Sequence, residues 1–308
     1  MARRKKGRPV HGWLVFDKPA GMTSPQAVGL VRRLFDAQKA GHAGTLDPLA
    51  TGILPIALGE ATKTVPYAVD GVKHYRFTVR WGAETDTDDA EGDVTVTSEA
   101  RPERQAIEAV LAQFTGEIMQ VPPVFSAIKV DGNRAYDLAR EGETVVLAAR
   151  PVHVETLTLC EMPDRDTAIF ETRCGKGTYV RSLARDMGRE LGCRGHLIAL
   201  RRTRVASFEE AQAVTVEALK RAAETGGEAL QRLLLPVEAA LQALTVIHVG
   251  QNDAARLLRG QAVLVRGRDA PIGHGPTYAV CKGSLVAIGQ IEKGELKPVR
   301  VFNFGGFA

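Results

Sequence analysis

Residues 41–59 read GHAGTLDPLATGILPIALG, and this stretch decides how the rest of the chain is interpreted. It places two glycines, a histidine and Asp47 within seven residues and then continues into an apolar segment. Because Pro48 disfavours helical dihedrals at the residue before it, Asp47 is expected in a loop that leads into a buried element. In such a loop the acid is either a functional carboxylate or a turn residue that caps its own backbone.

The residues before this stretch predict a strand, a turn and a helix. Residues 13–16 are an apolar run typical of a short buried strand, and residues 17–21 read as the turn that ends it. Ser24 is expected to cap the helix that follows, with Pro25 at its first position. One face of this helix carries the apolar residues Ala27, Val31, Leu34 and Phe35.

The composition is that of a globular protein with room for more than one module. The chain has 308 residues, 44% hydrophobic and 25% charged, which suffices for a full core and a smaller second unit. Its net charge of +4 says little about partners, and no run of about 18 apolar residues indicates a membrane span. The first eight residues include five basic ones without the apolar core of a secretory signal. They read as a solvated tail or as a weak contact with a polyanion.

The four cysteines, at positions 160, 174, 193 and 281, are scattered along the chain. None forms a C-x-x-C pair, so the sequence predicts neither a zinc site nor a redox motif. Scattered free cysteines favour a reducing cytoplasm over secretion.

An acidic segment and a basic segment stand out. Residues 84–99 contain seven acids and no basic residue, yet they lack the glycine and the closing glutamate of a calcium loop. We interpret them as a solvated acidic loop that stays away from nucleic acid. Residues 173–204 contain nine basic residues and two acids, a local charge of +7, which is typical of a polyanion-binding surface rather than an ordinary solvated helix face.

Two further regions predict strands. Residues 74–81 alternate polar and large residues, so Tyr75 and Phe77 share one face, where they either pack in the core or stack on a ligand. After a hinge near Leu244 the chain changes to short strands with glycine-rich turns, which favours a compact β-barrel-like module.

Several separated motifs together resemble the bacterial TruB family of pseudouridine synthases, which act on the T loop of transfer RNA. The motif D-K-P-x-G-x-T-S occupies residues 17–24, with Phe16 where leucine is usual, and residues 41–59 match the family's signature loop. The K-x-Y strand, the G-x-Y-x-R motif at 177–181 and the third motif at 197–203 follow in the same order. The matching region runs from residue 12 to about residue 205.

The resemblance implies a role for each matched residue. Asp47 is the catalytic acid, and Arg181 pairs with it and holds down its pKa. Tyr75 lies against the target base, and His42 enters the space that the flipped base leaves. Tyr179 and Leu200 are further substrate contacts, and Lys18 and Pro19 give structural support, with a direct phosphate contact by Lys18 as the alternative. The local positive charge, rather than the resemblance, assigns RNA-backbone contacts to Arg185, Arg189, Arg201 and Arg202.

The implied fold is α+β, a mixed and largely antiparallel sheet with flanking helices, followed by a small RNA-binding barrel of the PUA type. The expected division is a basic disordered tail at 1–10, a catalytic domain at 11–243 with a mobile insertion at about 120–150, and the PUA-like domain at 244–308. Leu258 to Val263 resembles the start of that domain.

The implied activity is isomerisation of uridine 55 in the T loop of tRNA to pseudouridine by a cytoplasmic monomer, with a possible aid to tRNA folding. No cofactor, metal, membrane or protein partner is expected. Asp47 could attack the sugar, attack the base or remove a sugar proton, and the sequence leaves these routes open. The alternatives are a non-catalytic RNA-binding or RNA-folding protein, and a metal-dependent nuclease built on the acids at 84–93.

Overall fold

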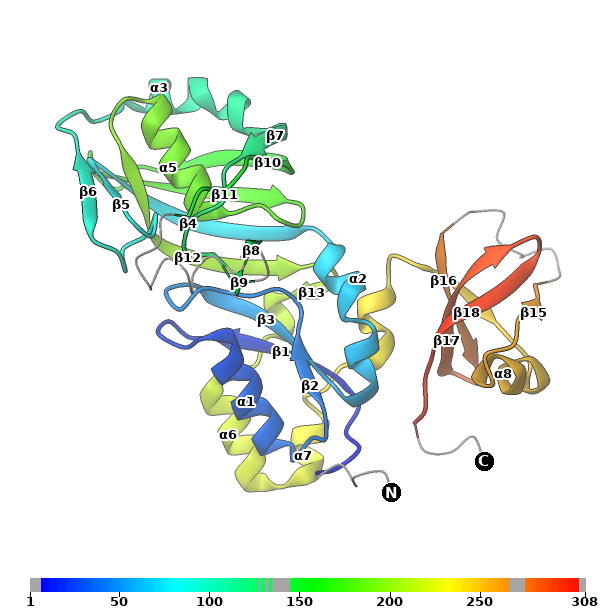
Figure 1. The fold of residues 1–308 in the computed structure, drawn as a ribbon. Helices are drawn as coiled ribbons and strands as arrows, with labels where there is room; N and C mark the ends of the chain where they lie inside the picture. Colours follow the sequence, from blue (N-terminus) through cyan, green and yellow to red (C-terminus); the bar gives the residue numbers. More distant parts are fainter. Residues whose placement is uncertain (1–6, 127, 131–132, 135–144, 266–274, 305–308) are drawn as a thin grey trace.

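A nine-stranded sheet organises the first two thirds of the chain (Figure 1). The computed structural model describes residues 7–126, 128–130, 133–134, 145–265 and 275–304. Residues 1–6 of the tail predicted at 1–10 lie outside the described residues, and so do residues 127, 131–132 and 135–144 of the insertion predicted at about 120–150. The predicted motion of that insertion stays a prediction.

The sheet has the strand order β1-β3-β12-β4-β11-β10-β7, with β2 paired to β3 and β13 paired to β12. Its strands are β1 (Gly12–Lys18), β2 (Ala40–His42), β3 (Thr51–Leu58), β4 (Lys73–Trp81), β7 (Gly116–Gln120), β10 (Arg150–Glu161), β11 (Thr167–Cys174), β12 (Gly195–Val205) and β13 (Phe208–Glu209). All neighbours are antiparallel except β3 and β12, which pair in parallel through Arg201–Thr51 and Arg202–Gly52 alone. The predicted α+β class with a mixed, largely antiparallel sheet is therefore confirmed.

The narrow parallel junction divides the sheet into two lobes. We call the part with β1, β2 and β3 the first lobe and the part with β4, β7, β10, β11 and β12 the second lobe. Short hairpins add β5 (Ala83–Thr85) with β6 (Val94–Thr97), and β8 (Lys129–Val130) with β9 (Asn133–Arg134).

Helices flank both lobes. The α-helices before the C-terminal module are α1 (Ser24–Leu34), α2 (Val65–Asp70), α3 (Arg104–Val110), α5 (Val180–Glu190), α6 (Val216–Thr225) and α7 (Gly227–Gln231). The described residues also form the 3₁₀ turns η1 (Gly59–Lys63), η2 (Leu111–Phe114), η3 (Glu210–Gln212) and η4 (Val237–Leu241). Among the described residues, no helix is both long enough and apolar enough to cross a bilayer.

The first helix begins one residue earlier than predicted. Thr23, not Ser24, is the N-cap of α1, because its hydroxyl accepts from the Gln26 backbone N–H while the Gln26 side chain accepts from the Thr23 N–H. Ser24 is therefore free for another contact, and it is buried.

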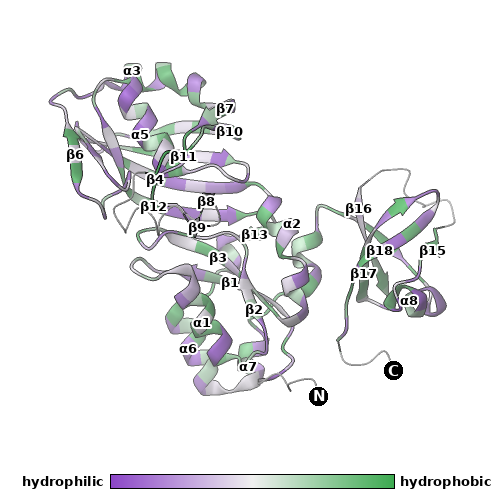
Figure 2. Ribbon diagram, viewed as in Figure 1, coloured by the Kyte–Doolittle hydropathy of each residue, from purple (hydrophilic) through white to green (hydrophobic). Residues whose placement is uncertain are grey.

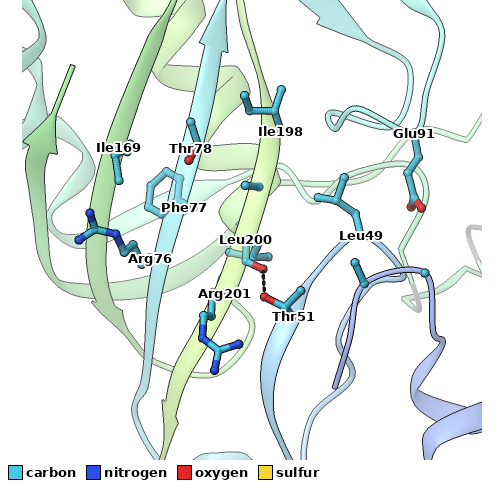
Figure 3. A pocket seen from close by; sticks show the side chains of 13 residues that line it. Leu49, Thr51, Arg76, Phe77, Thr78, Glu91, Ile169, Ile198, Leu200 and Arg201 are labelled. Carbon is cyan, nitrogen blue, oxygen red and sulfur yellow. Dashed lines mark hydrogen bonds between the residues drawn. The ribbon is translucent and has the colours of Figure 1, made fainter. Parts of the chain in front are cut away.

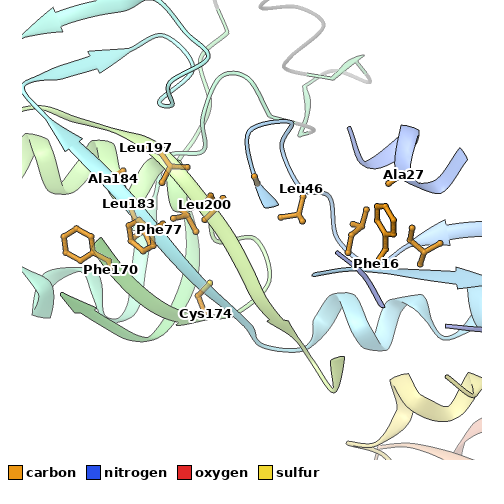
Figure 4. Close-up of a cluster of buried hydrophobic side chains, with 14 of the residues drawn as sticks. Phe16, Ala27, Leu46, Phe77, Phe170, Cys174, Leu183, Ala184, Leu197 and Leu200 are labelled. Carbon is orange, nitrogen blue, oxygen red and sulfur yellow. The ribbon is translucent and has the colours of Figure 1, made fainter. Parts of the chain in front are cut away.

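One apolar core runs through both lobes (Figure 4). In the first lobe, Phe16 of β1 and Leu54 of β3 pack with Ala27 of α1. In the second lobe, the rings of Phe77 and Phe170 stack with centroids 5.3 Å apart, and α5 covers them with Leu183 and Met187. Figure 2 shows hydrophilic and hydrophobic residues alternating along α1 and α6, as expected for helices that cover a sheet.

The C-terminal module is a five-stranded sheet in the order β14-β16-β17-β18-β15. Its elements are β14 (Thr245–His248), α8 (Gln251–Leu258), β15 (Val263–Leu264), β16 (Pro276–Cys281), β17 (Ser284–Glu292) and β18 (Glu295–Val301). The strand-rich PUA-like fold is confirmed, although α8 was not predicted. The module contacts η1, where the Lys63 ammonium donates to the Val301 carbonyl at 2.8 Å and the Asn303 N–H donates to Glu60 at 2.9 Å.

Candidate active site

Asp47 lies in the loop between β2 and β3, at the junction of the two lobes. Its side chain is 34% exposed, and its carbonyl accepts from the Ala50 N–H at 3.1 Å. The preceding residue, Leu46, is buried and fixed to α1, because the Ser24 hydroxyl donates to the Leu46 carbonyl and accepts from the Leu46 N–H. These bonds, at 3.0 and 2.9 Å, hold the backbone immediately before the acid.

Lys18 fixes the backbone on the other side of Asp47. Its ammonium is fully buried and donates to the carbonyls of Pro19, Met22 and Pro48 at 2.9, 2.8 and 3.2 Å. Burial lowers the pKa of Lys18 to about 8, against the opposing effect of the nearby Asp47 carboxylate. Lys18 and Pro19 thus join the turn after β1 to the loop that carries Asp47.

Arg202 holds the start of the same loop from β12. Its buried guanidinium donates to the carbonyls of Ile53, Gly44 and Thr45 at 2.8, 3.0 and 3.4 Å. The strand β3 passes so close that a Cβ on Gly52, which has φ +94°, would lie 2.3 Å from the Arg202 carbonyl oxygen. Only glycine fits this approach. The expected contact of Arg202 with RNA phosphates is corrected, because its side chain is enclosed and its donors serve the protein itself.

Arg181 reaches Asp47 from the second lobe. It lies in the first turn of α5, its side chain is 5% exposed, and its Nε is 2.9 Å from Asp47 Oδ2. Its other nitrogens donate to the carbonyls of Thr87 and Phe125, each at 2.9 Å, and Nη1 is 3.6 Å from Asp89 Oδ2. The sequence motifs that carry Asp47 and Arg181 thus meet in an ion pair across the junction.

The pKa of Asp47 is set by opposing effects. Burial raises it above the ordinary value and is the largest cause, while the Arg181 guanidinium lowers it, Asp89 raises it and Lys18 lowers it. The expected direction of the Arg181 effect is therefore right, but the net shift is upward rather than downward. The two cations, Arg181 and Lys18, therefore oppose the effect of burial and favour the ionised carboxylate.

The basic stripe of α5 faces the acidic segment instead of solvent. Arg185 Nη1 is 2.8 Å from Asp88 Oδ2, and both side chains are buried. Arg189 makes two hydrogen bonds with Glu84, at 2.9 and 2.7 Å. The interpretation of residues 84–99 as a wholly solvated loop is wrong for Glu84, Asp88 and Asp89, which are buried. The expected RNA-backbone role of Arg185 is corrected for the same reason, whereas Arg189 is half exposed.

The remaining predicted substrate residues lie on strands and helix ends around Asp47. Tyr75 of β4 is half-buried, and its cross-strand neighbour on β12 is Arg202. Leu200 of β12 is buried.

Two further predicted residues lie at the ends of elements. Tyr179 immediately precedes α5, and burial raises the pKa of its hydroxyl. His42 ends β2; burial and the Arg202 charge lower its pKa, and its Nδ1 is buried without a hydrogen bond among the described residues.

An open cavity of about 550 Å³ adjoins the loop (Figure 3). It is lined from the loop side by Gly21, Leu49 and Thr51, whose hydroxyl donates to the Leu200 carbonyl at 3.3 Å. Arg201 also lines it, with its guanidinium paired to Asp17 at 3.1 Å and to Glu210 at 2.6 Å. Asp47 and Arg181 are not among its lining residues, so the ion pair lies outside this cavity.

Sequence reasoning missed two residues of this site. Asp89 faces Arg181, yet it was read as part of a solvated loop, because no local pattern reveals that an arginine 92 positions later will enclose it. Ser24 was read as a helix cap, and the adjacent Thr23 was the signal that another residue could take that role.

Comparison with known proteins identifies the class. A crystal structure of a Cbf5-Nop10-Gar1 complex matches with a TM-score of 0.72 and 26% identity, covering 95% of this chain and 84% of that chain. An archaeal box H/ACA sRNP Nop10-Cbf5 complex also gives 0.72 and 26%, covering 98% and 91%. Residues 32–180 match the family model described as TruB family pseudouridylate synthase (N terminal domain), and residues 181–242 match the tRNA pseudouridylate synthase B C-terminal domain. The fold is that of a pseudouridine synthase.

Proteins of similar sequence show to which family of pseudouridine synthases the chain belongs. A protein named tRNA pseudouridine synthase B from Bradyrhizobium diazoefficiens is 59% identical over 306 residues, covering 98% of this chain and 89% of the relative. A protein of the same name from Agrobacterium fabrum is 56% identical over 305 residues, covering 97% of both. The chain belongs to the TruB family of pseudouridylate synthases, as the motifs predicted.

Proposed function

We propose that the protein isomerises uridine 55 in the T loop of tRNA to pseudouridine, with Asp47 as the catalytic residue. The reaction breaks the bond between the sugar C1′ and N1 of uracil and forms a bond from C1′ to C5 of the same base. The C5 proton is lost and N1 gains a proton, so no group or electron pair enters or leaves. The names of the relatives support tRNA as the substrate.

One observation carries the proposal: the carboxylate of Asp47 is partly open to the junction while its cationic neighbour is closed off. Asp47 is 34% exposed and Arg181 5% exposed, at 2.9 Å from each other. An ionised carboxylate in a desolvated site can attack carbon or remove a proton, and a fixed guanidinium keeps it ionised. A glycosidase would instead require a protonated carboxyl beside the leaving group.

The other residues receive roles that follow from their positions. Because the target base lies inside a folded loop, it must be flipped out, at a cost of a few kcal/mol. Tyr75 would stack on the flipped base, and Leu200 and Tyr179 would complete its apolar surroundings. The lowered pKa of His42 keeps its imidazole neutral at neutral pH, which suits insertion among stacked bases. Of the four predicted backbone contacts, Arg189 and Arg201 retain partly exposed guanidinium groups that could reach phosphates.

The decisive experiment combines chemistry and binding. A T-loop hairpin with tritium at C5 of uridine is incubated with the wild-type protein and with Asp47→Asn. Wild type should release tritium, the variant should release none, and the affinity of the variant should stay within about tenfold, roughly 1.4 kcal/mol.

The same experiment separates the alternatives. A non-catalytic RNA-binding or RNA-folding protein would bind the hairpin and release no tritium in wild-type form. A metal-dependent nuclease would cleave the hairpin and lose activity with a chelator, whereas the proposed isomerisation leaves the RNA intact and is insensitive to chelators.

A further inference from the structure

The segment that follows β7 wraps around the start of α5. We call residues 120–126, with the sequence QVPPVFS, the strap. The Val121 carbonyl accepts from the Ser182 hydroxyl and from Arg185, each at 2.9 Å, and the Phe125 carbonyl accepts from Arg181 at 2.9 Å. The two prolines between these carbonyls are buried and have no N–H groups of their own. The strap therefore presents acceptors to the first turns of α5.

Gln120 begins the strap and makes its most specific contact. Its side chain is buried, and the residue is 2% exposed. Its Nε2 donates to the Tyr179 carbonyl at 3.1 Å, and its Oε1 accepts from the Tyr179 N–H at 2.8 Å. One amide group thus satisfies both backbone groups of a residue 59 positions away.

This contact anchors the N-terminus of α5, which has no side-chain cap. Tyr179 is the N-cap of α5, but its side chain makes no capping hydrogen bond, and tyrosine is not a capping residue. The orientation of the first turn must then come from outside the helix. Arg181 lies in that turn, two residues after Tyr179, so a rotation at Tyr179 would move the guanidinium away from Asp47.

We infer that Gln120 is a positioning residue for the reaction: it fixes Tyr179 and, through the first turn of α5, the Arg181 guanidinium against Asp47. This inference rests on the proposed function. Within the described part of the chain, Gln120 does not line the cavity, and its side-chain hydrogen bonds go to Tyr179, so we expect its effect on Asp47 to pass through Tyr179 and the helix. A displacement of about 1 Å at a reacting group can cost on the order of 100-fold in rate.

The test uses Gln120→Met, which keeps the length of the side chain and removes both hydrogen bonds. The matched control is Gln38→Met, which removes a side-chain amide bond to the Gly7 carbonyl, 3.0 Å long, outside the site. Single-turnover pseudouridine formation in the T-loop hairpin should fall by about 10- to 100-fold in Gln120→Met, with RNA affinity within about threefold. The acid limb of its pH–rate profile should move to higher pH, because a displaced Arg181 lowers the pKa of Asp47 less. Gln38→Met should match wild type in rate and in pH profile.

A second variant distinguishes positioning from a general loss of stability. Gln120→Glu restores the two-bond geometry only when its carboxyl is protonated, since a carboxylate cannot donate to the Tyr179 carbonyl. Burial raises the pKa of this carboxyl, and the exposed cross-strand neighbour Arg150 opposes the rise. The rate of Gln120→Glu divided by that of Gln120→Met, measured at the same pH, should increase as the pH falls.

The outcomes are separable. If wild type forms no pseudouridine, the proposed function fails. If wild type is active and both variants share its rate and pH profile, the positioning role is overturned. It is also overturned if the rates fall without a change in the acid limb and the Glu-to-Met ratio is independent of pH. If Gln120→Met does not fold, the rate of Gln120→Glu is divided by the wild-type rate at low pH and at neutral pH. A ratio that is higher at low pH supports the positioning role, and a ratio that is independent of pH overturns it.

Discussion

Asp47 and Arg181 meet at 2.9 Å, but the two lobes hold them by opposite means. On the first lobe, the side-chain donors Lys18 and Ser24, joined by Arg202 from β12, fix the backbone around Asp47 and leave its carboxylate partly open. On the second lobe, acceptors enclose the guanidinium of Arg181 itself. The comparison teaches which partner reacts: the carboxylate is available to a substrate, whereas the guanidinium is a fixed counter-charge.

After Asp47→Asn, the largest expected effect comes from removing Arg181, which the second lobe contributes to the ion pair. Arg181→Met should lower single-turnover pseudouridine formation by about 10³-fold, within the range for loss of a preorganised charge. The reaction requires ionised Asp47, so the rate falls as the pH drops through its pKa. Because Arg181 lowers that pKa, its removal should shift the acid limb to higher pH. Arg104→Met, on an exposed face of α3, is the control. An unchanged acid limb would contradict the role of Arg181 as counter-charge.

The buried ion pair between Arg185 and Asp88 should matter for the stability of the protein rather than for RNA binding. Arg185→Met leaves the Asp88 carboxylate buried and unpaired, so the free energy of unfolding should fall by about 3 kcal/mol. Chemical denaturation measures this loss. The slope of log affinity against log salt for the hairpin should stay the same in a folded sample. A slope reduced by about one unit would restore Arg185 as a phosphate contact.

On the first lobe, Lys18→Met should affect stability and turnover together. The substitution leaves three loop carbonyls without their shared donor, at a cost of about 1–3 kcal/mol. It also removes a positive charge that lowers the pKa of Asp47, so the acid limb should move upward, though less than in Arg181→Met. Thermal unfolding and the pH–rate profile report the two effects. A larger shift than that of Arg181→Met would reverse the assigned order of the two cations.

The smallest expected effect is tested by substituting two adjacent residues, Ser24 and Thr23, of which only Ser24 contacts the Asp47 loop. Ser24→Ala removes the bonds to Leu46 and should cost about 1 kcal/mol of stability together with a severalfold loss of turnover. Thr23→Ala removes the cap of α1 and should cost a similar free energy. Turnover at a temperature where both variants are folded should fall only in Ser24→Ala. Equal turnover in the two variants would show that the bonds to Leu46 do not position Asp47.

The sequence by itself determined the fold class, through the resemblance of its motifs to the TruB family, and local patterns predicted the strands at 13–16 and 74–81. The catalytic role of Asp47 stays a prediction of that resemblance. These features depend on local patterns: the 41–59 loop, the alternation at 74–81, and the glycine turn before the helix of Arg181. Each of these patterns occupies only a short stretch of sequence, because dihedral preferences and burial periodicity act over short distances along the chain.

Only the tertiary structure decided what the charged residues do. Local charge counting assigned Arg185 and Arg202 to RNA and the acids at 84–89 to solvent, yet Arg185 pairs with an acid 97 positions away and Arg202 binds loop carbonyls about 150 positions away. The local sequence does not specify whether an arginine will meet a phosphate, a carboxylate or a carbonyl, since its guanidinium can donate to all three. Its partner is chosen by the chain topology, which brings distant segments into contact and removes the water that would otherwise screen them.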